Sequence, residues 1–525
     1  MQTIRSILMA GLLALPLGAA HAETPDDILV VAQNIDDIVA LDPAQAYEFT
    51  SGEIVTNVYD RLVQYDAEDP TTLAPGLASE WAEDADAKTI AFTMRDSAVF
   101  HSGNPVTAQD AAGSLHRVIK LGLTPAFILA QLGWTPENVE EMVTAEGDIV
   151  TIRYEGDYSP AFVLNVLAAR PASVVDMATV MANEVDGDMG NAWLNTNSAG
   201  SGPFSIQTYR PAEIVRLEAN EDYFKEGPKL SGVILRHVAE AATQQLLLER
   251  GDVDMARNLT PDQVAALGEG LKVETYPQAA VHFLSFNQKT DSLTNPAIWE
   301  AARYLVDYEA MTNTILAGQM EIHQAFWPKG FPGAVEETPY GYDPEKAKAI
   351  LAEAGVELPI TVEMDVIAAA PFTDMAQALQ SSFAGAGIEF EIVPGTGAQV
   401  ITKYRERTHE AMLLYWGPDF MDPHSNAKAF AYNSDNGDDA YAATTTWRNA
   451  WAVPDELNAK TTAALTEADP ETRLEMYREL QRAVQAEGPI VIMFQAAYQV
   501  AMDEDVTGYV NGATSDFVFY RLVEK

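Results

Sequence analysis

Apolar runs and helix-end signals follow one another along the whole chain, and this pattern predicts a mixed α/β protein. Short apolar or alternating runs bounded by turn residues are typical of strands. No repeat of solenoid period interrupts the pattern. The strand-like runs include Ile28–Ala32, Thr89–Met94, Ile149–Tyr154, Ile214–Glu218, Val233–His237, Val281–Asn287, Ile360–Val366 and Ile388–Val393.

Helices are predicted between these runs from their end signals. Thr107, with Asp110 three residues further on, forms a capping-box arrangement before residues 108–121, and Gly122 ends that helix. An N-cap residue, then proline at the first helical position, then glycine at the end is the expected asymmetry of a helix. Three more helices are expected to begin at Asn295-Pro296, Asp343-Pro344 and Asp469-Pro470 and to end near Gly318, Gly355 and Gly488.

The N-terminal residues 1–22 have the pattern of a secretory signal peptide. Arg5 precedes the apolar run Ile7–Ala20, which ends in the small-x-small box Ala20-His21-Ala22. The run is too short and too interrupted to span a bilayer stably. The alternative is a buried N-terminal helix. We expect a mature chain that begins near Glu23 and is exported.

Cysteine usage and chain length further narrow the kind of protein that the sequence encodes. The sequence contains no cysteine, so we expect no lipid anchor at the cleavage site, no disulfide and no thiolate metal site. Removing residues 1–22 from 525 leaves 503 residues, which suits two large lobes better than one core. The expected location is the periplasm, and we expect a monomer.

The charge balance is strongly acidic. The chain has 32 Lys and Arg residues against 77 Asp and Glu residues, which gives a formal net charge of −45. Such a surface repels nucleic acid and anionic lipid headgroups, so neither is an expected partner. It mildly favours cationic or zwitterionic solutes, although solubility alone is the alternative explanation.

Catalytic and metal-binding signals are mostly absent from the sequence. No His-Glu-x-x-His, Gly-x-Ser-x-Gly or phosphate-binding Gly-x4-Gly-Lys motif occurs. The eight histidines are scattered without the spacing of metal ligands. We therefore expect no enzyme activity, no cofactor, no catalytic residue and no metal site.

A set of short segments, each weak alone, occurs along the chain in one order. They are Leu41-Asp42-Pro43, Asn57–Val63, Leu73–Trp81, Thr89–Arg95, Phe100–Gly103, Val106–Asp110, Gly202-Pro203-Phe204, Asn220–Phe224, Gly251–Asp254, Phe286-Asn287, Tyr342–Ala347 and Trp416–Pro423. Together they resemble the peptide/nickel-type solute-binding proteins of ABC importers, known as family 5. The resemblance extends over essentially the whole mature chain.

This resemblance implies a fold of the type II periplasmic-binding-protein kind. Two α/β lobes are joined by two crossing strands, which we assign to Val281–Asn287 and Ile490–Gln495. Lobe I is then formed by residues 23–280, with 490–525 returning to it, and lobe II by residues 281–489. The solute is enclosed in the cleft between the lobes by a hinge motion.

The resemblance also implies candidate ligand-binding residues. Asp419, in the loop after the apolar strand Ala411–Tyr415, is expected to pair with the α-ammonium group of a peptide, with Trp416 and Gly417 beside it. From lobe I, Tyr47 and Thr50 are expected to contact the solute. The alternative for Asp419 is a cap of the turns around Pro418 and Pro423.

One departure from the family bears on the solute. Segment 368–372 contains Phe372, a further candidate contact, but lacks the arginine that clamps the ligand carboxylate in dipeptide binders. Strict dipeptide specificity is therefore not expected. The preferred function is capture of a peptide or peptide-like solute for an ABC permease and ATPase complex. Alternatives are another solute on the same fold (nickel chelate, haem, opine or oligosaccharide), or an enzyme or signalling partner.

Overall fold

The computed structural model describes residues 24–525 except 68, 70, 71, 369, 396, 441, 443, 513, 515 and 516. The predicted signal peptide and the cleavage site before Glu23 lie outside the described residues. In the described part of the chain, no helix is long and apolar enough to cross a membrane. Strands and helices occur throughout, so the predicted mixed α/β class is confirmed.

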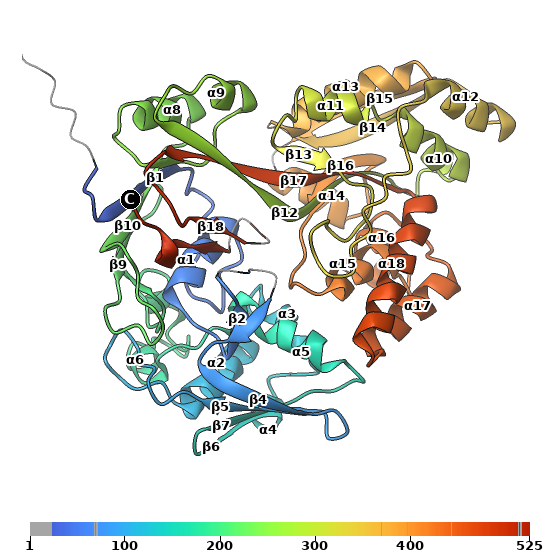
Figure 1. Ribbon diagram of the computed structural model, residues 1–525. Helices are drawn as coiled ribbons and strands as arrows, with labels where there is room; N and C mark the ends of the chain where they lie inside the picture. Colours follow the sequence, from blue (N-terminus) through green and yellow to red (C-terminus); the bar gives the residue numbers. More distant parts are fainter. Residues whose placement is uncertain are drawn as a thin grey trace, which may run out of the picture.

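One large sheet of eleven strands runs through the molecule (Figure 1). Ten of its strands follow one path, and β13 (Met320–Ile322) pairs with β17 beside that path. The path is β15 (Ile388–Gly395), β14 (Ile360–Ile367), β16 (Ala411–Trp416), β12 (Leu271–Phe286), β17 (Ile490–Asp503), β11 (Met255–Ala256), β1 (Ile28–Gln33), β10 (Gly232–His237), β9 (Ile214–Ala219) and β8 (Phe204–Arg210).

The two longest strands, β12 and β17, pair antiparallel at the centre of this sheet and run from one half of the molecule to the other (Figure 1). Their register extends from Leu271 opposite Asp503 to Ser285 opposite Ile490, with an irregularity between Pro277 and Val281. Both strands are longer than the predicted crossings. The first part of β12 was not predicted as a strand, because it is polar and contains a proline, which is rare inside strands.

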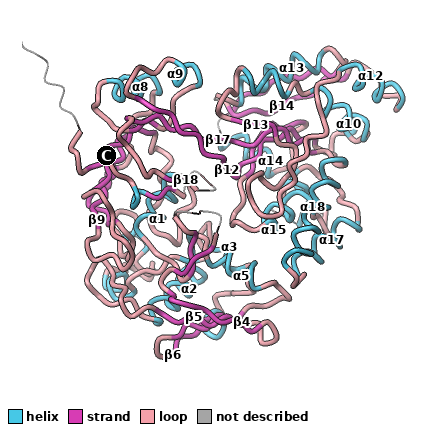
Figure 2. Tube along the Cα trace, viewed as in Figure 1, coloured by secondary structure: helices cyan, strands magenta, loops and turns pink. Residues whose placement is uncertain are grey.

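We keep the names lobe I and lobe II for the predicted residue ranges, and the division itself stays a prediction. A separate four-stranded sheet lies in lobe I, at the end away from the crossing strands (Figure 2). It packs with α2, α3 and α5 around one hydrophobic core, while a second core lies around β1, β9, β10 and α1. The strands are β4 (Ala78–Asp84), β5 (Thr89–Met94), β7 (Ile149–Arg153) and β6 (Val143–Glu146), and the helices are α1 (Phe49–Val58), α2 (Ala108–Leu121), α3 (Ala126–Ala130) and α5 (Pro160–Leu167).

In lobe II, helices cover both faces of the strands. One core lies between β14, β15 and β16 and the helices α10, α12 and α13, and another packs β12 and β16 on α15, α17 and α18. These helices are α10 (Pro296–Leu305), α12 (Pro344–Glu353), α13 (Phe372–Ala384), α15 (Pro423–Ala431), α17 (Asp455–Thr466) and α18 (Pro470–Ala486). The smaller elements are β2 (Val63–Tyr65), β3 (Leu73–Pro75), β18 (Val510–Asn511), β19 (Val518–Phe519), α4 (Val139–Met142), α6 (Met177–Ala182), α7 (Asn191–Leu194), α8 (Ala241–Glu249), α9 (Pro261–Ala265), α11 (Tyr308–Asn313), α14 (Gly397–Arg405) and α16 (Thr445–Arg448), with short 3-10 turns at Arg170–Ala172, Asp291–Leu293, Asp438–Ala440 and Tyr520–Leu522.

The helix-end signals gave three correct helices and one wrong one. The capping box at Thr107 is present, and Gly122 ends α2 in the left-handed conformation. The helix expected from Asn295-Pro296 to Gly318 is wrong, because α10 ends at Leu305 and α11 starts anew at Tyr308. The Asp307 side chain accepts from the backbone N–H of Ala310, so an internal N-cap starts the second helix.

The Leu41-Asp42-Pro43 segment is held by a buried ion pair. The Asp42 carboxylate is fully buried and accepts two hydrogen bonds from Arg117 of α2, at 2.8 and 2.6 Å. Asn191 donates to the same carboxylate at 2.7 Å. Such bidentate pairing compensates the charges that burial removes from water. The segment that leads to Tyr47 is thus anchored to α2.

We expect Asp42→Asn to lower the free energy of unfolding by about 3–5 kcal/mol, because it leaves the buried Arg117 guanidinium without its counter-charge. The measurement is urea unfolding of the mature protein. Asp157→Asn is the matched control, since Asp157 pairs with Lys88 at the surface, with side chains 80% and 39% exposed, and it should cost less than about 1 kcal/mol. Equal losses in both variants would contradict the anchoring role.

Candidate functional site

A cavity of about 500 Å³ lies between segments of both lobes. Lobe I contributes the loop before α1, the start of α3 and the turn at Arg170–Ala172, together with residues 514 and 517 of the C-terminal segment. Lobe II contributes α14, the end of β16, the loop that follows β16, and α16. Cavities of this size, with apolar walls and a few polar groups, are typical of small-molecule sites. Four predicted ligand residues line it: Tyr47, Trp416, Gly417 and Asp419.

Tyr47 and Asp419 touch each other across the cavity. The Tyr47 hydroxyl donates to Asp419 Oδ1 at 3.0 Å, and this side-chain hydrogen bond links the two lobes at the cavity. Burial and the nearby Asp419 charge raise the pKa of Tyr47, so its hydroxyl stays protonated as the donor. The Asp419 backbone N–H donates to Ser425 Oγ at 2.9 Å, which fixes the loop on the start of α15.

The Asp419 carboxylate is partly buried in the cavity wall. Burial raises its pKa above the ordinary value, while the hydrogen bond from Tyr47 and the positive charges of Lys428, Arg448 and Arg170 lower it. Desolvation and compensating cations therefore act in opposite directions. A cationic group of a solute at this position would add to the second effect.

Three arginines line the same cavity, and sequence reasoning missed all of them: Arg170, Arg405 and Arg448. The Arg448 guanidinium lies 5.7 Å from the Trp416 ring and 5.4 Å from the Tyr404 ring, in cation–π geometry. Burial, with the neighbouring positive charge of Arg405, lowers the pKa of Arg448. Burial and the nearby Arg61 charge lower the pKa of Arg170 to about 10. No local motif marks these arginines, because only the tertiary fold brings them together.

Phe372 lies in a different environment from the other predicted contacts. It is the first residue of α13, only 9% exposed, and it belongs to the hydrophobic core of lobe II. Its ring packs against His282 at 5.6 Å and Tyr415 at 5.9 Å between centroids. Tyr415 lines the cavity, so Phe372 supports that wall from behind. A ligand-binding role for Phe372 stays a prediction.

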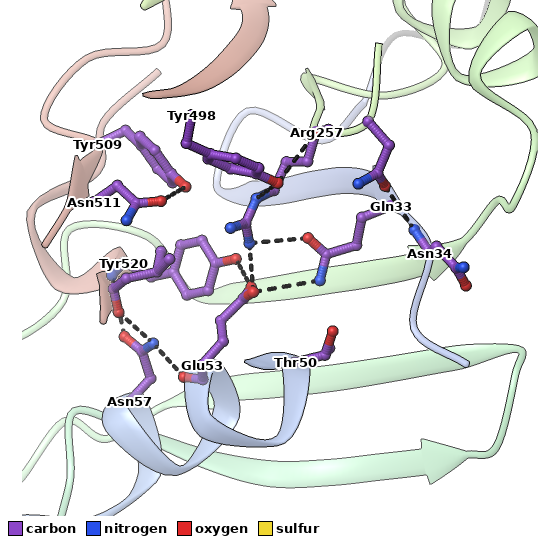
Figure 3. Close-up of polar contacts among 12 residues, drawn as sticks. Gln33, Asn34, Thr50, Glu53, Asn57, Arg257, Tyr498, Tyr509, Asn511 and Tyr520 are labelled. Atoms are coloured by element: carbon purple, nitrogen blue, oxygen red, sulfur yellow. Dashed lines mark hydrogen bonds and ion pairs between the residues drawn. The ribbon is translucent and has the colours of Figure 1, made fainter. Parts of the chain in front are cut away.

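Thr50 lines a second cavity, of about 250 Å³, beside the first. Asp37 and Phe49 line both cavities. Figure 3 shows Thr50 next to a polar network built on Glu53 and Arg257. Thr50 is therefore separated from Asp419 by the Asp37 and Phe49 side chains, and its predicted contact with the solute stays a prediction.

No group of three or more His, Asp or Glu side chains within the described residues is arranged to hold a metal ion. The features that the cavity does present are opposite charges, aromatic rings and hydroxyl groups. They suit reversible binding of a polar solute.

Comparison with known proteins identifies the family. Residues 72–438 match the bacterial extracellular solute-binding proteins, family 5 Middle. The chain belongs to family 5 of these proteins. The family resemblance read from the segment order is thereby confirmed, and so is the fold it implied.

Three relatives illustrate the range of the family. The probable D,D-dipeptide-binding periplasmic protein DdpA of Escherichia coli (strain K12) is 28% identical over 98% of this chain and 98% of its own length. The nickel-binding periplasmic protein of the same organism is 24% identical over 81% of this chain and 82% of its own. The solved structure of DppA from Helicobacter pylori in complex with peptide STSA is 21% identical, with a TM-score of 0.78 over 95% of this chain and 98% of its own.

Membership of family 5 establishes the general activity. Proteins of this family are non-catalytic, solute-binding components of ABC import, so the prediction that the chain is not an enzyme is confirmed. The family implies a small solute and a partner ABC permease. Since relatives are named for peptides and for nickel, membership alone leaves the solute open.

The buried His282 behind the cavity wall gives a pH prediction. Burial lowers its pKa from 6.5 to about 4, and its Nδ1 has no hydrogen-bond partner in the described part of the chain. Between pH 6.5 and 4 the unfolded chain binds a proton that the folded state excludes, so stability falls as pH falls, by about 1.4 kcal/mol per unit. Between pH 6.5 and 4.5 the free energy of unfolding of His282→Gln should therefore fall by about 2 kcal/mol less than that of wild type.

The measurement is urea unfolding at both pH values. His116→Gln is the control, because His116 is a partly exposed histidine of α2. Parallel pH dependence of His282→Gln and wild type would show that His282 is not held neutral by the fold.

Proposed function

We propose that this family 5 protein captures a zwitterionic peptide or peptide-like solute in the periplasm and delivers it to its ABC permease. The observation that carries the proposal is that groups of opposite charge line one cavity, namely the carboxylate of Asp419 and the guanidinium groups of Arg405 and Arg448. A peptide with free termini presents one positive and one negative group at a limited separation. We also propose the lobe ranges given above, with the solute held between them.

The ammonium end is assigned to Asp419. A carboxylate that closure removes from water needs a counter-charge, and a charge-assisted hydrogen bond supplies it. The Tyr47 hydroxyl, 3.0 Å from Asp419 Oδ1, orients the carboxylate. The Trp416 ring beside it is a surface that attracts cations.

The carboxylate end is assigned to Arg405 and Arg448. Neither guanidinium forms a hydrogen bond or ion pair with another described residue. Arginine suits planar, two-point binding of a carboxylate. This pair supplies the cation that segment 368–372 lacks, and it comes from α14 and α16 instead.

Other solutes on the same fold remain the alternative, namely a nickel chelate, haem, an opine or an oligosaccharide. Native mass spectrometry of protein purified from its source separates these classes by the mass of the retained solute. A peptide-sized mass supports the proposal, and a metal, haem or sugar mass contradicts it.

We expect Asp419→Asn to weaken binding of a free-amine peptide by about 2–5 kcal/mol, because the peptide ammonium is then buried without a counter-charge. A thermal-shift screen of di- and tripeptides on stripped, refolded protein selects the probe, and calorimetry measures it. The N-acetylated form of that probe should bind wild type poorly. The difference in affinity between the free-amine and N-acetylated forms should be smaller for Asp419→Asn than for wild type. Asp439→Asn, which removes an exposed lobe II carboxylate, is the matched control. Wild-type affinity in Asp419→Asn would refute the assignment.

Arg448→Gln should weaken binding of the same peptide as a free acid by about 1.5–3 kcal/mol, the range for a hydrogen bond to a charged group. The C-terminal amide of the peptide should bind wild type and Arg448→Gln alike. Arg482→Gln is the control, since Arg482 is a half-exposed arginine paired with Glu337. If wild type binds acid and amide equally, the arginine pair does not hold the carboxylate.

A further inference from the structure

The second cavity is a compartment with a fixed polar floor. Glu53, Arg257 and Gln33 are each 2–3% exposed and form one hydrogen-bonded group (Figure 3). The Tyr520 hydroxyl also donates to Glu53, and Arg257 Nε donates to the Tyr498 hydroxyl at 3.1 Å. Burial alone lowers the pKa of Arg257, but the Glu53 charge and the surrounding tyrosines raise it well above its usual range. The floor is therefore a compensated ion pair, already in place without a solute.

Apart from the Glu53–Arg257 ion pair, the charged residues that line the compartment are negative. Its charged lining residues are three carboxylates, Asp36, Asp37 and Glu53, against one guanidinium, Arg257. Since Glu53 compensates Arg257, Asp36 and Asp37 are left over. Asp37 Oδ2 accepts from the backbone N–H of Thr50 at 3.1 Å, whereas its other oxygen is buried and has no hydrogen-bond partner among the described residues.

A second unsatisfied group lies in the same compartment. Thr50 is 7% exposed, and its hydroxyl makes no hydrogen bond to any described residue. In Figure 3 the Thr50 side chain lies beside the network with no dashed line to it. A buried carboxylate oxygen without a partner is costly, and a ligand that donates a hydrogen bond to Asp37 relieves that cost, with the Thr50 hydroxyl beside it as a further acceptor.

The compartment adjoins the main site. Asp37 and Phe49 line both cavities, so a solute held at Asp419 would enter the compartment only by extending past these two side chains. The Phe49 ring is 45% exposed although it is large and apolar. It offers a surface for the aliphatic part of a chain that ends in a polar group.

We infer that the second cavity is a subsite for a protonated amine or guanidinium group of the solute, bound by Asp37 and Thr50. This rests on the proposed function and narrows it, because the solute then carries a basic side chain in addition to its termini. An anionic group is disfavoured, since Asp36 and Asp37 repel it and Arg257 is already paired with Glu53.

The first test is independent of the solute and uses the absence of cysteine from the sequence. Thr50→Cys introduces a single thiol into the compartment, and Ser381→Cys introduces one on the exposed face of α13 as the control for overall charge. Each is labelled with a trimethylammonium-ethyl and a sulfonato-ethyl methanethiosulfonate. The ratio of the two rates cancels the intrinsic reactivity of the thiol.

We expect the cationic-to-anionic rate ratio at Thr50→Cys to exceed the control ratio by about fivefold or more, because the local carboxylates attract the cationic reagent. Adding Asp37→Asn should lower this excess, and Asp36→Asn should lower it by less. A ratio equal to that of Ser381→Cys, or one unchanged by Asp37→Asn, would overturn the inference.

The second test uses trialanine peptides carrying lysine or norleucine at each position in turn, measured by calorimetry. Wild type should prefer lysine at one position by about tenfold or more, the value of a charge-assisted hydrogen bond. Asp37→Asn should abolish the preference, while Asp96→Asn, in an exposed loop, should keep it. Peptides that bind without a lysine preference would overturn the subsite. If labelling is charge-selective and none of the peptides binds, the subsite stands and peptide capture is wrong.

Discussion

The antiparallel pairing of β12 with β17 is the constraint on which the geometry of the main cavity depends. Val281 of β12 lies opposite both Gln495 of β17 and Trp416 of β16. Strand β12 therefore connects β17 directly to β16, the strand that leads into the loop with Asp419. Asp419 follows β16 by only three residues. On the other side, β17 pairs with β11, which pairs with the lobe I strand β1. The two walls are therefore positioned from one central pair of strands.

Three of the wall segments are also fixed within their own lobe by buried arginine–carboxylate pairs. Asp42 binds Arg117 before the Tyr47 loop, and Glu53 binds Arg257 below Thr50. Asp422 accepts from Arg473 at 2.9 and 2.7 Å directly after the Asp419 loop. Rigid walls of this kind reduce the ordering cost of binding.

The sequence predicted the parts of this design that local chemistry controls. Capping residues located α2, α12 and α18, whereas α1 gave no signal because it lacks a side-chain cap and is buried almost all round. Segment order located Tyr47 and Asp419, which both line the main cavity. Arg405 and Arg448 could not be found in this way, since their role comes from the packing of α14 and α16. The same applies to Thr50, whose separation from Asp419 is a property of the tertiary fold.

The Tyr47–Asp419 hydrogen bond has a consequence for transport. Asp419, the carboxylate that we assign to solute binding, already accepts a hydrogen bond from Tyr47 of the opposite lobe. The Tyr47 hydroxyl therefore competes weakly with a solute for this carboxylate. With Asp419 in its proposed role, a retained solute has to offer this carboxylate more than a tyrosine hydroxyl does, which would disfavour neutral molecules. The same bond links residues of opposite lobes without any solute, so a solute that binds Asp419 would replace a contact between the lobes rather than create the first one.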